Sequence, residues 1–72
     1  MDVAKLVQSA NQTAAFFAAY PHEEAVAGVA EHLAAFWEPR LRRRILDHLR
    51  EGGAGLLPLA AEAIGRLRDS AR

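Results

Sequence analysis

The side chains that could perform catalysis or bind a metal are few in this 72-residue chain, and their spacing is poor. The absence of cysteine excludes thiol nucleophiles, disulfides, iron–sulfur clusters and thiolate metal ligands. A metal site built from His32, His48 and a carboxylate is disfavoured, because these residues do not offer a ligand pair at the i, i+4 spacing of a helical site. His22 lies ten residues before His32, which is not one helical face. We therefore expect no catalytic residue and no metal site.

A glycine-rich stretch at residues 52–55 could suggest a phosphate-binding loop. Such loops follow a β-strand and end in Gly-Lys-Ser/Thr, and both features are missing here. The stretch is better explained by a helix that ends at Gly52, since glycine tolerates the left-handed backbone conformation of a helix C-terminus.

The most unusual segment is Phe36–Arg44, where an aromatic pair, a proline and four arginines occur within nine residues. Arginine pairs with carboxylates in a bidentate manner, and arginine and tryptophan are enriched among the residues that dominate binding energy at interfaces. Because no polar catalytic set surrounds the segment, it predicts a docking surface. The residues expected at this interface are Phe36, Trp37, Pro39, Arg40, Arg42 and Arg43.

Two other interpretations of the arginines stay open. They can form an ordinary solvated helix face, or they can neutralise the phosphates of a nucleic acid. Nucleic-acid binding is disfavoured because the formal net charge is zero and the neighbours Leu41, Ile45 and Leu46 are not base-reading residues. The charge is nevertheless uneven: residues 1–36 hold one lysine against four acidic residues, and residues 37–72 hold eight arginines against five.

A chain of this length predicts a single domain, residues 1–72, whose core is small enough to profit from association with another chain. No apolar run approaches the ~20 residues that a membrane span needs. The beginning of the chain also lacks the basic and then apolar pattern of a secretory signal. We therefore expect a cytoplasmic protein that does not associate with membranes.

The apolar residues recur at helical spacing throughout. A first helix is expected to begin after Asp2, a suitable N-cap, and to end before Pro21, which can be the first residue of the second. The buried stripe of the second helix includes either Phe36 or Trp37. Gly28 inside it costs about 1 kcal/mol relative to alanine, which suggests either a close helix–helix contact or a tolerated glycine.

Pro39 either kinks this helix or starts a third one, and a restart is favoured because Leu41, Ile45 and Leu49 set up a new stripe at spacing four. Pro58 is expected to start a fourth helix. The prediction is an all-α fold, a small bundle of about four short helices. The surface ion pairs expected from i, i+4 spacing are Arg43 with Asp47 and Glu62 with Arg66.

Several motifs resemble those of one protein family. The most specific are Phe36-Trp37-Glu38-Pro39-Arg40-Leu41-Arg42 and the later Gly52-Gly53-Ala54-Gly55-Leu56 with Pro58-Leu59. Ala10-Asn11-Gln12, Phe16-Phe17, residues 24–30, His32-Leu33 and His48-Leu49 complete the pattern. On these residues the chain resembles the delta subunits of soluble, NAD-dependent, molybdenum-containing formate dehydrogenases. It departs from them at Leu41, where methionine is expected, and at Leu57, where a polar residue is expected.

This resemblance implies a non-catalytic, cofactor-free accessory subunit of a cytoplasmic complex. The implied partner is the large catalytic subunit with its molybdopterin cofactor, and the implied role is support of its assembly, stability or cofactor insertion. We expect Trp37 and the Pro39 corner to dock there, Arg40 and Arg42 to pair with carboxylates of the partner, and Phe36 to lie in the core beneath. The alternative is a small nucleic-acid-binding or self-associating module that uses the Arg40–Arg44 helix, with a homodimer formed by the isolated chain.

Overall fold

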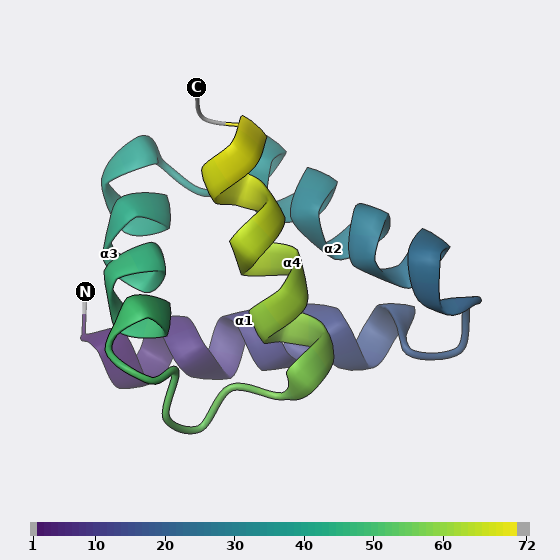
Figure 1. Cartoon of the computed structure of the whole chain (residues 1–72), viewed down its shortest axis with the longest axis horizontal. Helices are drawn as coiled ribbons and strands as arrows, with labels where there is room; N and C mark the ends of the chain where they lie inside the picture. Colours follow the sequence, from purple (N-terminus) through teal and green to yellow (C-terminus); the bar gives the residue numbers. More distant parts are fainter. Residues whose placement is uncertain (1, 71–72) are drawn as a thin grey trace.

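The chain folds into four α-helices: α1 Val3–Phe17, α2 His22–Phe36, α3 Pro39–Arg50 and α4 Pro58–Ser70 (Figure 1). The structure is a computed structural model that describes residues 2–70, with side chains up to residue 67, and this part contains no β-strand. Helix α4 contacts the three other helices, most extensively α2. The prediction of an all-α fold of four short helices is confirmed. No helix in the described residues is both long and apolar enough to cross a membrane.

The helix ends follow the local signals in the sequence. The carboxylate of Asp2 accepts a hydrogen bond from the backbone N–H of Ala4 at 3.3 Å and so caps α1 as predicted. Pro21 was expected to be the first helical residue of α2. It is instead the N-cap residue, and the helix begins at His22. Pro39 is the first residue of α3, so the restart is confirmed and one kinked helix is excluded.

The core is built from alanine and branched aliphatic side chains. Its twelve buried residues include five alanines and no aromatic residue, and no polar or charged side chain is buried among the described residues. Leu6, Leu33, Ile45 and Ile64 are the largest side chains that are fully enclosed. Phe17 and Trp37 pack against the edge of this core and are partly buried. Small residues at the centre let the helix axes come close together.

Gly28 of α2 is in close contact with α1 through the ring of Phe17. A Cβ atom built at this position would lie 2.5 Å from Cε1 of Phe17, well inside van der Waals contact. The ring of Phe17 therefore occupies the space that any other residue at position 28 would need. Of the two explanations offered by the sequence, the close helix–helix contact is confirmed.

The loop between α3 and α4 is held by backbone and side-chain hydrogen bonds. Helix α3 ends in a Schellman motif: the N–H of Gly53 bonds to the carbonyl of His48 at 2.9 Å and that of Gly52 to Leu49 at 3.1 Å. Gly52 has φ 117°, which confirms its predicted position after the helix end. Nε2 of His48 also lies 2.8 Å from the carbonyl of Ala54.

Asn11 attaches this loop to α1. Its Nδ2 donates to the carbonyl of Gly55 and its Oδ1 accepts from the backbone N–H of Leu57, both at 2.9 Å. Leu57 is the residue just before α4, so one side chain on α1 fixes the start of the last helix. The amide suits this role because it offers a donor and an acceptor together.

The two glycines inside helices predict opposite effects of the same substitution. Gly65→Ala should raise the free energy of unfolding by about 0.5–1 kcal/mol, because alanine is the better helix former and a Cβ at residue 65 meets no atom within 4 Å. Gly28→Ala should lower it by about 1–2 kcal/mol, because the displaced ring of Phe17 outweighs the same gain in helix propensity. Urea unfolding monitored by circular dichroism measures both values. Stabilisation by Gly28→Ala would contradict the close approach.

Candidate functional site

The α2–α3 corner, residues 36–43, contains all six residues predicted to form an interface. Helix α2 ends at Phe36, Trp37 is its C-cap in an extended conformation, and Glu38 caps α3 without a side-chain hydrogen bond. The backbone N–H of Trp37 still bonds to the carbonyl of Leu33 at 3.0 Å. Two residues in extended conformation, Trp37 and Glu38, therefore connect α2 to α3 and change the direction of the chain.

Arg42 stabilises the corner from within. Its Nη1 donates hydrogen bonds to the carbonyl of Trp37 at 2.7 Å and to that of Ala34 at 2.9 Å. These carbonyls belong to the last turn of α2, where a cation also interacts favourably with the helix dipole. The side chain that was expected to pair with a partner's carboxylates therefore has partners within this chain. Its role at an interface stays a prediction.

The expectation that Phe36 lies in the core is wrong. Its side chain is 75% exposed, whereas Trp37 is half-buried and packs against the core. Successive helical residues point about 100° apart, and the extended backbone at Trp37 turns its indole back towards the core. The ring of Phe36 lies instead on His32, with 4.7 Å between ring centroids.

The outer face of α3 is basic. Arg40, Arg43 and Arg44 are exposed, and none of them forms an ion pair with the described side chains. Asp47 pairs with Arg50 at 3.5 Å, so the predicted pair of Arg43 with Asp47 is wrong. Arg43 instead lines a hollow near Leu67 of α4. Three guanidinium groups are thus available to an external acceptor.

A second feature, which the sequence analysis did not identify, is a groove between α1 and α2. We call it the aromatic groove; its lining comprises Ser9, Gln12, Thr13, Phe16 and Phe17 of α1 with His32 of α2 and Trp37. Phe16, 71% exposed, forms one wall. The sequence shows that the lining residues between Ser9 and Phe16 are three or four positions apart and so share one side of α1. Whether this side faces α2 depends on how the helices pack, which the spacing does not determine.

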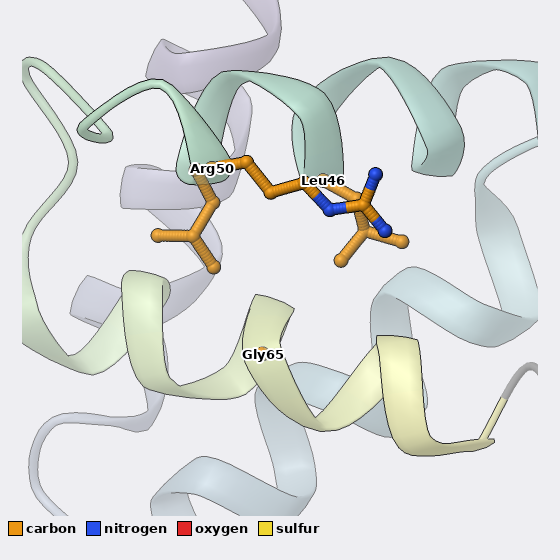
Figure 2. Close-up of a pocket in the computed structure, with 4 residues that line it drawn as sticks. Leu46, Arg50 and Gly65 are labelled. Carbon is orange, nitrogen blue, oxygen red and sulfur yellow. The ribbon is translucent and has the colours of Figure 1, made fainter.

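The hollow between α3 and α4 offers no reactive groups. It is lined by Leu46, Leu49, Arg50 and Gly65, and Figure 2 shows the side chain of Arg50 lying along α3 towards Leu46. Because glycine has no side chain, the space between Gly65 of α4 and the facing side chains of α3 stays open. One exposed arginine among aliphatic side chains provides neither an acid–base pair nor a nucleophile.

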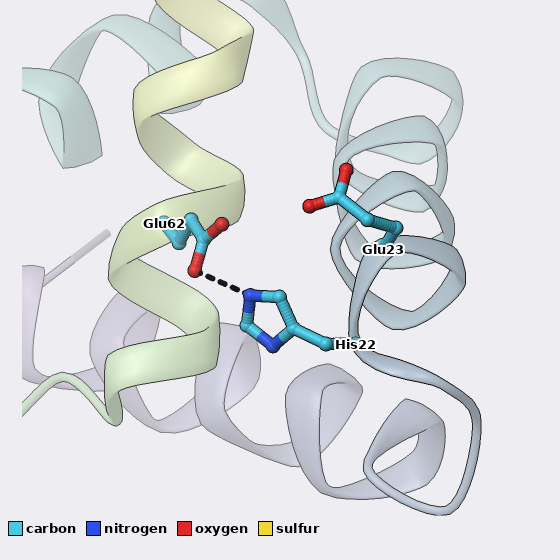
Figure 3. A group of neighbouring side chains, drawn as sticks. All are labelled: His22, Glu23 and Glu62. Carbon is cyan, nitrogen blue, oxygen red and sulfur yellow. Dashed lines mark hydrogen bonds and ion pairs between the residues drawn. The ribbon is translucent and has the colours of Figure 1, made fainter.

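His22, Glu23 and Glu62 bring their ligand-type atoms within 4.8 Å of one another (Figure 3). Nε2 of His22 lies 2.8 Å from Oε1 of Glu62, and Oε2 of Glu23 accepts a hydrogen bond from Arg66 at 2.8 Å. The predicted ion pair of Glu62 with Arg66 is therefore replaced by contacts between α2 and α4. The hydrogen bond from Arg66, followed by its charge, lowers the pKa of Glu23. With one carboxylate occupied by arginine and all three residues exposed, the group joins two helices and does not form a prepared metal site.

The comparison with protein families is decisive. The family model described as NADH-dependent formate dehydrogenase delta subunit FdsD matches residues 5–64. This chain belongs to the FdsD family. The match spans α1, the α2–α3 corner, the glycine-rich loop and the first half of α4, and it confirms the family resemblance found in the sequence. Neither the curated proteins nor the solved structures gave a significant match.

Arg42 and Arg43 of this FdsD chain should respond differently to truncation. Arg42→Met keeps much of the aliphatic side chain but removes two hydrogen bonds to α2, so the free energy of unfolding should fall by about 1–2 kcal/mol. Arg43→Met, on the exposed face, should stay within about 0.5 kcal/mol of the parent. Denaturant titrations of both variants test this difference. Equal stabilities would show that Arg42 does not hold the corner together.

Proposed function

We propose that this chain is a non-catalytic accessory subunit that docks on the large catalytic subunit of a cytoplasmic formate dehydrogenase and supports its assembly, stability or cofactor insertion. Membership of the delta-subunit family supports the assignment to this complex, and the exposed residues of the α2–α3 corner support its choice as the docking surface. The observation that carries the proposal is a set of exposed arginines without ion pairs to described side chains, next to an exposed phenylalanine.

Within the corner the predicted interface residues divide into two groups. Phe36, Pro39, Arg40 and Arg43 are exposed, so they can contact a partner directly. Trp37 and Arg42 lie behind them, where the indole packs on the core and the guanidinium bonds to α2. In this proposal they position the four exposed residues. An already ordered corner loses little conformational entropy on binding, which favours affinity.

The arginines favour an acidic partner surface. Guanidinium groups on one helix face that form no ion pair with the described side chains can form bidentate hydrogen bonds with carboxylates, and they cost little to desolvate compared with lysine. Nucleic acid remains the alternative ligand for the same face. Its phosphates would give a steep salt dependence and no preference for one protein.

Reversal of one charge at the corner should impair docking. When the tagged chain is co-expressed with the large subunit, Arg40→Glu should reduce recovery of that subunit about tenfold or more, because a glutamate would face carboxylates. Arg50→Glu makes the same charge change at the other end of α3 and should leave recovery close to that of the parent. The amount of co-purified large subunit, quantified by mass spectrometry, is the readout.

Circular dichroism of the isolated variants is the control, and both should remain helical because the changed residues are exposed. Equal recovery with Arg40→Glu and Arg50→Glu would refute the docking surface. Recovery of nucleic acid in place of the large subunit would refute the proposed function itself.

A further inference from the structure

We infer that the aromatic groove between α1 and α2 receives an apolar side chain from a segment of the large catalytic subunit, and that this segment carries carboxylates opposite Arg40 and Arg44. The inference rests on the proposed function. It extends the contact from the α2–α3 corner to α1 and adds Phe16, a residue outside the predicted interface.

Exposed aromatic surface is concentrated at this groove. Phe16 and Phe36 are 71% and 75% exposed, the highest values among the large apolar side chains of the described residues. Phe16 lines the groove together with His32. The ring of His32 contacts the ring of Phe36, with 4.7 Å between the ring centroids. Phe16 in the groove and Phe36 beside it are thus joined through the ring of His32, and exposed aromatic side chains gathered in this way favour a site for a partner over single exposed apolar residues.

The polar side chains at the groove are available to a peptide. Gln12 and His32 line it, and neither takes part in the side-chain hydrogen bonds of the described residues. An amide and an imidazole can both donate and accept, so they can bond to the backbone of an incoming segment while its side chain fills the space next to Phe16. This combination of apolar walls and a few polar groups is typical of ligand-binding clefts.

The charges near the groove identify the chemistry of the occupant. No acidic residue is among the described residues that line it. Arg40 follows Trp37 by three residues, so their Cα atoms are at most ~11 Å apart. Arg44 lies one turn further along α3, where it lines a hollow with Val3 of α1 and with Asp47, His48 and Glu51. A segment that leaves the groove past Trp37 and follows α3 meets Arg40 and Arg44 before it reaches the acidic Asp47, which favours carboxylates on this part of the segment.

A second copy of this chain fits the groove less well. A stable interface buries about 800 Å² on each partner, and two phenylalanines provide roughly half of that. A symmetric contact would have to extend over the corner, where it would bring the arginines of both copies together. A larger, acidic partner avoids this repulsion.

Two exposed aromatic residues of α1 and the following turn provide a matched test. Phe16 lines the groove, whereas Tyr20 is 50% exposed, contacts Phe17 and is not part of the lining. The full chain is titrated against purified large subunit in biolayer interferometry. Phe16→Ala should raise Kd about tenfold or more, and Tyr20→Ala less than about threefold. Arg44→Glu should also raise Kd and should reduce its dependence on salt.

The outcomes separate this inference from the proposed function. If the parent chain binds and Phe16→Ala has no larger effect than Tyr20→Ala, the groove is refuted and docking through the corner survives. If the parent chain does not bind the large subunit, both are refuted. If the isolated chain dimerises in analytical ultracentrifugation and Phe16→Ala abolishes the dimer, the occupant is a second copy and the inference is wrong. Thermal unfolding of each variant confirms that the fold is retained.

Discussion

Close helix packing through alanine and glycine is the constraint on which the rest of this structure depends. Five of the twelve buried residues are alanines, and at Gly28 the ring of Phe17 lies where a Cβ would be. Helices packed this closely leave no internal space for a large aromatic ring. The aromatic residues of the chain therefore lie at the edge of the core or outside it, although each of them is apolar enough to be buried.

This packing leaves several large side chains exposed, so that a small chain without cysteine still presents a distinctive surface. The chain orders its exposed residues with internal hydrogen bonds: Arg42 ties the α2–α3 corner to α2, and Asn11 ties the glycine-rich loop to α1. Both residues lie in motifs that the FdsD resemblance also identified. Their hydrogen bonds hold the scaffold together, and in the proposed function recognition falls to exposed neighbours such as Arg40 and Phe36.

Signals within one helix were sufficient to predict much of the fold. The N-cap at Asp2, the helix end at Gly52 and the new helix at Pro39 each depend only on residues that are close in the sequence. They could therefore be predicted from the sequence alone. Contacts between helices were harder to predict. Spacing along α4 suggested that Glu62 pairs with Arg66, whereas the packing of α2 against α4 gives each of them a partner on α2. The choice of Phe36 as the core residue failed for a different reason: the extended backbone at Trp37, just after the helix end, decided which aromatic ring faces inwards.

Hydroxyl-radical footprinting of the assembled complex tests the docking surface most directly. It compares the oxidation of each side chain in the free chain with its oxidation when the chain is bound to the large subunit. Binding through the corner and the aromatic groove predicts strong protection of Phe16 and Phe36, with unchanged oxidation of Tyr20. Protection of Tyr20 or of the His22–Glu62 contact between α2 and α4, with both phenylalanines still fully oxidised, would contradict it.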